Sequence, residues 1–217
     1  MKFTTASTQG REGFKENTLL KVYFIIFLIL WAYSLLNTSD LANWIIENTL
    51  TIIALVSLTL TYKKFKFSNL SYTLIFIYVY LHIYGAMYTY SENPFGDWLK
   101  ETLDLERNHY DRIVHFSFGF LLGYPLRDYF KNWFDWPNWV CWVLPIEITM
   151  SFSGLYEIIE WLVADVFFTH QGAAYLGTQG DIWDAQKDMA LAFLGAVLVM
   201  VIASTIKKLF DKRPVIA

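Results

Sequence analysis

The sequence predicts an all-α membrane protein, a polytopic bundle of six transmembrane helices with both termini in the cytoplasm. Hydrophobic residues make up 55% of the 217 residues and charged residues only 17%, whereas ordinary globular domains have roughly 45–50% apolar and about 25% charged residues. Six apolar runs approach the length of about 20 residues that crosses a bilayer as a helix, and none shows the alternation of a strand. Lysine and arginine also concentrate in one set of loops.

The six runs form one membrane domain, residues 19–210, between a polar N-terminal tail, residues 1–18, and a C-terminal tail, residues 211–217. In order they cover residues 19–36, 41–60, 70–90, 110–126, part of 139–168, and 189–210. The fifth run would be about 45 Å long as one helix, so we expect Pro145 and Gly154 to kink it. The polar tail before the first run argues against a cleavable signal peptide.

Basic residues predict the orientation of the bundle, because the cytoplasmic flanks of membrane helices carry lysine and arginine in excess. Of the 17 lysines and arginines, four fall on the side opposite the two tails. These four are Lys100, Arg107, Arg112 and Lys187. We therefore expect both tails in the cytoplasm of a bacterium and a multi-pass protein of its inner (plasma) membrane, with the acidic loop that follows the third run outside.

Ionisable residues gather at the outer ends of four predicted helices. They are His82 in the third helix, Asp111, Arg112 and His115 in the fourth, Glu157 and Glu160 in the fifth, and Asp181, Asp184 and Asp188 before and at the start of the sixth. Residues three or four apart share a helix face, so pairs within each group can project toward one point. A carboxylate at mid-membrane costs about 2.5–3.5 kcal/mol. We therefore expect a compensating partner at this end of the bundle.

A divalent metal ion would compensate these acids, because carboxylate oxygens with one or two imidazoles suit Mg²⁺, Mn²⁺ or Zn²⁺. The expected ligands are Asp184, Asp188, Glu157 and His115, with Asp111, Asp181 and His82 as further candidates. Glu160 is the candidate general base, and Arg112 the candidate group for binding anionic charge.

The constellation favours a membrane-embedded, metal-assisted hydrolase or transferase that acts on a lipid headgroup or a lipid-linked phosphate at the outer leaflet. The expected partners are membrane lipids and a lipid-linked or other phosphate-bearing small molecule. No basic patch large enough for nucleic acid is present in the sequence. The sequence does not indicate an oligomeric state.

Each of these features also has a simpler interpretation. Arg112 can pair with Asp184 to fasten two helices, His82 can be a core histidine with satisfied nitrogens, and the loop "AYLGTQGD" can be a plain turn instead of an anion cradle. On these interpretations the protein is a scaffold or assembly factor. A proton-coupled carrier is a third alternative, but only Glu47 and Glu147, acids expected at other depths, are available to continue a proton path.

Two further features are expected to be structural. Gly119, Gly123 and Gly195 lie within predicted helices, where small residues let helix backbones approach closely. Asp128 lies at the predicted cytoplasmic end, away from the acidic cluster. We assign none of these residues a role in binding or catalysis.

Several of these segments also carry a family resemblance. In this order, "HIYGAMYTYSENPFG", "NHYDRIVHFSFGF", "YEIIEW" and "GTQGDIWDAQKDM" resemble the YjdF-type family of bacterial inner-membrane proteins, and the likeness extends over residues 15–210. This resemblance implies a multi-pass inner-membrane protein without implying an activity.

A more distant resemblance connects the same segments to VanZ-like proteins, one of which is associated with glycopeptide resistance. His115, Phe116 and Glu157 match the pattern of that family. Arg112 stands in place of a lysine, Glu160 replaces a glutamine, and Asp188 takes the position of an asparagine. The candidate site is therefore more acidic than the VanZ pattern.

Overall fold

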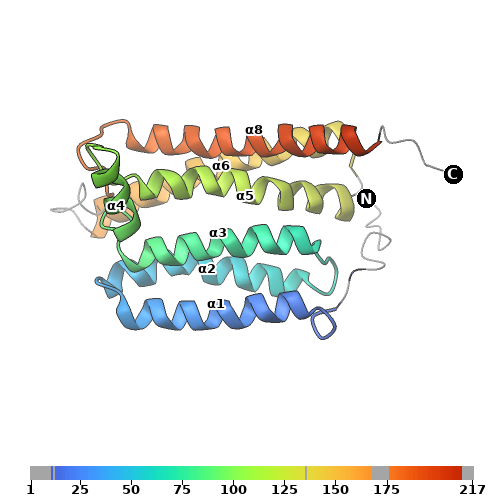
Figure 1. Cartoon of the computed structure of the whole chain (residues 1–217), viewed down its shortest axis with the longest axis horizontal. Helices are drawn as coiled ribbons and strands as arrows, with labels where there is room; N and C mark the ends of the chain where they lie inside the picture. The colour runs from blue at the N-terminus through green and yellow to red at the C-terminus, as the bar shows by residue number, and fades with distance from the viewer. Residues whose placement is uncertain (1–10, 12, 135, 168–175, 212–217) are drawn as a thin grey trace.

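A computed structural model describes residues 11, 13–134, 136–167 and 176–211. Within those residues the structure contains helices and no strands, so the predicted all-α fold is confirmed. The helices are α1 (Thr18–Asn37), α2 (Leu41–Thr61), α3 (Asn69–Met87), α4 (Pro94–Thr102), α5 (Tyr110–Trp133), α6 (Asn138–Phe167) and α8 (Asp184–Asp211). The long helices lie side by side, and α4 lies at the end of the bundle opposite the start of α1 (Figure 1).

Each predicted apolar run forms one of the long helices. Within the described residues, four of them are long and apolar enough to cross a membrane, namely α1, α2, α3 and α8. Helices α5 and α6 have 24 and 30 residues and lie alongside these four (Figure 1). The sequence did not predict the short helix α4. Residues 1–10 and 212–217, most of the two predicted tails, lie outside the described part of the chain.

Polar caps set the starts of four helices. The side chain of Asn17 accepts a hydrogen bond from the Leu20 N–H at the start of α1, and Asp40 and Ser68 do the same for α2 and α3. Such caps satisfy backbone N–H groups that have no partner within the helix. Asn93 caps α4, whose first residue is proline, a residue suited to the first helical position. Helix α6 runs through its Pro145 without interruption.

Helices α5 and α8 approach each other so closely at their glycines that no side chain would fit at those positions. A Cβ atom at Gly119 would lie 1.8 Å from the carbonyl oxygen of Ala192, and one at Gly195 would lie 2.3 Å from that of Phe116. Ala192 and Ala196 are fully buried in this contact. The expectation that Gly119, Gly123 and Gly195 allow close packing is confirmed, since a Cβ at Gly123 would also crowd α8.

At the end of the bundle opposite α4, Asp128 links several segments through hydrogen bonds. Its carboxylate accepts hydrogen bonds from Arg11 at 2.8 Å, the Ser68 N–H at 2.9 Å and the Ser71 hydroxyl at 2.8 Å. Asn132 adds a fourth donor from the next turn of α5. Asp128 is thus structural, as expected, and joins the N-terminal segment, the start of α3 and the end of α5.

We predict that Gly119→Ala lowers the free energy of unfolding by about 1–3 kcal/mol, because the added methyl group must push α5 away from α8. Gly154→Ala is the matched control, since a Cβ there meets only the Met189 sulfur at 3.4 Å. Thermal unfolding of both variants in detergent measures the difference. Equal melting temperatures would contradict the close backbone contact.

Candidate functional site

The ionisable residues predicted to converge do meet at one end of the bundle. The start of α5 lies against the end of α6 and the start of α8, and α4 and the turn before α8 border the same region (Figure 1). Here α5 supplies Asp111, Arg112 and His115, while α8 supplies Asp184 and Asp188. Both helices start at this end and run in the same direction (Figure 1).

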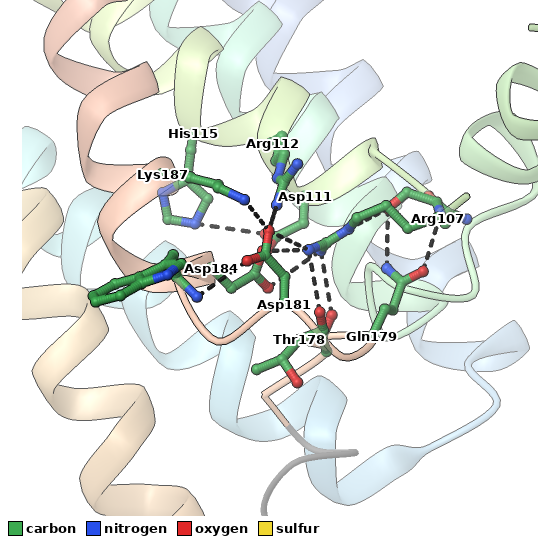
Figure 2. A network of polar contacts seen from close by, with 12 residues as sticks. Arg107, Asp111, Arg112, His115, Thr178, Gln179, Asp181, Asp184 and Lys187 are labelled. Carbon is green, nitrogen blue, oxygen red and sulfur yellow. Dashed lines mark hydrogen bonds and ion pairs between the residues drawn. The ribbon is translucent and has the colours of Figure 1, made fainter. Parts of the chain in front are cut away.

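Three basic side chains surround Asp181 and Asp184. Arg112 donates to Asp181 Oδ2 at 2.5 Å and to Asp184 Oδ1 at 3.0 Å. Arg107 donates to both oxygens of Asp184, and the Lys187 ammonium lies 2.5 Å from Asp181 Oδ2. Figure 2 shows these cations converging on the two acids. The predicted pairing of Arg112 with Asp184 is therefore present, in a larger cluster.

Asp181 lies just before α8, which begins at Asp184. Lys187 and then the Trp183 N–H hydrogen-bond to the Asp181 carboxylate and hold its pKa well below the usual range. Asp181 is therefore ionised at any physiological pH. Asp181 forms salt bridges with Arg112, Lys187 and, at 3.9 Å, Arg107, although the sequence suggested it as a metal ligand.

Arg107 is a central residue that the sequence analysis missed. Its guanidinium donates to the carbonyl oxygens of Thr178 at 3.2 Å and Gly177 at 3.4 Å as well as to Asp184. The turn within "AYLGTQGD" thus directs carbonyl oxygens at a cation, which fits the plain turn and not an anion cradle. The available signal was an arginine in a predominantly acidic loop, five residues before Arg112.

A pair of amide side chains fixes the same turn to the loop before α5. Asn108 N–H donates to Gln179 Oε1 at 2.9 Å, and Gln179 Nε2 donates to the Asn108 carbonyl at 3.0 Å. The Asn108 side chain also donates to the Asn93 carbonyl and to Asp97 of α4. The two loops and α4 are therefore held in one position relative to α5.

A second group of acids surrounds His115. Its Nε2 lies 3.5 Å from Asp111 Oδ1 and 3.5 Å from Glu157 Oε1. Ligand atoms of Asp111, His115 and Asp188 all lie within 4.8 Å of one another. Asp188 is only 2% exposed, and its Oδ1, like Glu157 Oε1, has no hydrogen-bond partner among the described residues. A buried carboxylate oxygen without a partner is costly, so this group is suited to receive a cation.

The donor set fits a divalent metal ion. Ligands on one ion at about 2.0–2.2 Å lie roughly 3–4 Å apart, so small side-chain rotations would close Asp111, His115 and Asp188 around it. Glu157 is in position to be the fourth ligand. Asp184, expected to be a ligand, is instead held by two arginines. Asp111, a further candidate in the sequence, lies in the group with His115 and Asp188.

His82 is a satisfied core histidine. Its Nδ1 lies 2.6 Å from the Tyr90 hydroxyl and its Nε2 lies 3.2 Å from the Glu47 carbonyl oxygen. Both ring nitrogens are therefore occupied, and His82 is not among the residues that form the three-ligand group. The simpler interpretation of this residue is the one that fits its contacts.

The expectation that Glu47 lies at another depth is wrong. Glu47 is buried in the second turn of α2, and its Oε2 accepts a hydrogen bond from the Tyr156 hydroxyl at 3.1 Å. The same hydroxyl interacts with Glu160. Counting from the start of α2 would have placed Glu47 at the depth of His115, because both helices begin at the same end of the bundle (Figure 1).

A cavity of about 390 Å³ lies between α2, α3, α5 and α6 and reaches this acid group. Its polar end is formed by His82, Tyr90, Asp111, His115 and Tyr156. The rest of its wall is largely apolar and includes Leu50, Ile53, Ala54, Ile75, Phe118, Leu122 and Ile159. From Asp111 to Leu122 the wall follows α5 for about 16 Å. Arg112 instead lines a groove between α5 and α8.

We predict that Arg107→Gln lowers the free energy of unfolding by about 3–5 kcal/mol, because Asp184 would stay buried with one of its two cationic partners lost. Lys187→Gln is the comparison, since Lys187 is half exposed and such a pair contributes at most about 1 kcal/mol. Denaturant titration in detergent measures the free energy of unfolding of both variants. A larger loss for Lys187→Gln would contradict the central position of Arg107.

Comparison with known proteins agrees with this membrane architecture. The family model described as "Predicted membrane protein (DUF2238)" matches residues 19–209. The Inner membrane protein YjdF of Escherichia coli (strain K12) is 32% identical over 185 residues, which cover 84% of this chain and 88% of that protein. No solved structure gives a significant match, and the likeness to VanZ-like proteins stays a prediction. The YjdF resemblance is confirmed: the chain belongs to the DUF2238 family of predicted membrane proteins.

Proposed function

We propose that this protein is a membrane-embedded, metal-assisted hydrolase that acts on the phosphate-bearing head of a lipid. The observation that carries the proposal is the position of the acid group around His115 at the polar end of an otherwise apolar cavity. Pockets for small molecules are commonly apolar with a few convergent polar groups. This arrangement suits an amphiphile whose polar head lies at the acid group, where it reacts, and whose chain lies along the apolar wall.

The proposed topology has six transmembrane helices, with α5 and α6 crossing the membrane beside α1, α2, α3 and α8. Both termini are cytoplasmic, and the acid group lies near the outer leaflet of a bacterial inner membrane. Two observations support this topology. The basic residues favour the end of the bundle opposite the site, and YjdF is an inner-membrane protein.

Asp111, His115, Asp188 and Glu157 would hold the ion, which supplies a positive charge to polarise a phosphoryl oxygen. Glu160 interacts with Tyr156, which lines the cavity. Glu160 would accept a proton from water as the water oxygen bonds to phosphorus. The bond from phosphorus to the leaving oxygen then breaks, and Glu160 returns the proton to that oxygen. The products are a phosphate or phosphomonoester and an alcohol, so water is the only co-reactant.

The orientation has a direct test with a membrane-impermeant thiol reagent on intact cells. In a Cys141→Ser background, Glu92→Cys should be labelled and Lys64→Cys should be labelled only after lysis. Both positions are exposed, whereas Asn93 beside Glu92 is buried and caps α4. The reverse pattern would place the acid group at the cytoplasmic face and overturn the proposed leaflet.

The activity is tested by metal content and by phosphate release from lipid phosphates in mixed micelles with Mg²⁺, Mn²⁺ or Zn²⁺. Asp188→Asn should lose both metal and turnover, because its carboxylate is a proposed ligand. Glu160→Gln should keep the metal and lose turnover by about 10²–10⁴-fold, the contribution of a general base.

Asp165→Asn is the control for these variants, since Asp165 is an exposed acid near the same end of α6. It should keep both the metal and the turnover. A purified protein that binds none of the three metals would overturn the proposal. So would a Glu160→Gln variant of unchanged rate, if turnover of the native protein depends on metal.

A second candidate function is a membrane scaffold, which the cluster around Asp181 and Asp184 favours. Salt bridges among five charged groups of α5, α8 and their loops can hold helices together without any chemistry. On this alternative, Asp184→Asn lowers thermal stability, and any loss of cellular function follows the loss of protein. A scaffold leaves one observation unexplained, namely that Glu157 Oε1 and Asp188 Oδ1 have no hydrogen-bond partner among the described residues.

A further inference from the structure

A second hollow lies at the same end of the bundle, between α5 and α8. It is an open groove of about 650 Å³, separate from the cavity that reaches His115. Its lining residues are His109, Arg112, Ile113, Phe116, Lys187, Ala190, Leu191 and Leu194. The proposed metal ligands are not among them, so nothing in the proposed hydrolase requires this groove.

The groove changes from polar to apolar along the helices. His109, Arg112 and Lys187 lie at the end of the bundle, and the lining below them is aliphatic and aromatic. Leu194 lies about 10 Å farther along α8 than Lys187 and is exposed. Among the described lining residues none is acidic. A ligand that fits this groove therefore has a polar head at the bundle end and an apolar chain directed toward the middle of the helices.

The charge at the polar end favours an anion. Arg107, Arg112 and Lys187 share two acids, Asp181 and Asp184, so the cluster keeps one positive charge. The Lys187 side chain is half exposed and can turn toward a ligand. Burial, with Arg112 and Arg107 nearby, lowers the pKa of His109. At neutral pH His109 is therefore a neutral hydrogen-bonding group beside Arg112 and Lys187 in the groove.

We propose that this groove binds an anionic glycerophospholipid from the surrounding bilayer. The phosphate lies against Arg112 and Lys187, and one acyl chain lies along Phe116, Leu191 and Leu194. Charge complementarity selects an anionic headgroup, and the apolar floor requires the chain, so free phosphate fits only half of the groove. Basic residues near a membrane surface attract anionic lipids in this way, and basic pockets between membrane helices bind anionic headgroups.

The test is competition for the purified full-length protein by native mass spectrometry, with equal amounts of dioleoyl phosphatidylglycerol and dioleoyl phosphatidylcholine. The native protein should retain more phosphatidylglycerol than phosphatidylcholine. Lys187→Gln should reduce that preference by roughly fivefold, the factor for one basic residue near the surface. Asp181→Asn should increase it, because an acid that competes for Arg112 and Lys187 is removed.

Two further variants separate the headgroup from the chain. Leu194→Trp fills the apolar part of the groove and should reduce binding of phosphatidylglycerol, whereas Lys100→Gln, in α4 at the same end but outside the groove, should change nothing. Thermal unfolding shows whether each variant is folded. Equal retention of the two lipids by the native protein would overturn the proposal.

Displacement of phosphatidylglycerol by excess inorganic phosphate, with Leu194→Trp binding as well as the native protein, would also overturn it in favour of a simple anion site. A native protein that prefers phosphatidylglycerol but shows no metal-dependent turnover would count against the proposed hydrolase alone, because the lipid groove uses none of the proposed metal ligands.

Discussion

The backbone contact between α5 and α8 is the constraint on which the rest of the site depends. Gly119 lies against Ala192, and the two helices run in the same direction from the same end (Figure 1). His115, one turn before Gly119 on α5, lies close to Asp188 of α8. Arg112, two turns before Gly119, donates a hydrogen bond to Asp184. Any residue larger than glycine at position 119 would separate the helices and with them both groups of ionisable side chains.

This register divides the charges into two groups of different character. Asp181 and Asp184 take the three basic side chains of the region, so these two acids are compensated within the protein. Asp111, Glu157 and Asp188 are left with one imidazole, although Asp188 is buried and the other two are only partly exposed. Carboxylates in such an environment are either protonated or balanced by a counter-charge such as a bound cation. The compensated group joins α5 to α8 and their loops, and the uncompensated group is the one for which we propose a bound cation.

The sequence predicted the helices and the end of the bundle at which the acids meet, because both follow from the lengths of the apolar runs and the alternation of helix direction. It did not predict which acid pairs with which base. Asp184 pairs with arginines because Arg107 reaches it from a loop that has no regular spacing, beside a turn that Gln179 fixes. Glu47 was misplaced because depth was judged from sequence context instead of counted from the start of its helix.

The cavity beside His115 opens between helices whose lining side chains are on the outer surface of the bundle. Ile53 of α2 and Phe152 of α6 are 55% and 57% exposed and line that cavity, while Asn108 and Gln179 hold the loops above it in place. A ligand on this route arrives from the plane of the membrane. Its effective concentration is then its mole fraction among the surrounding lipids, so diluting it with detergent or inert lipid lowers occupancy even when its amount per volume is constant.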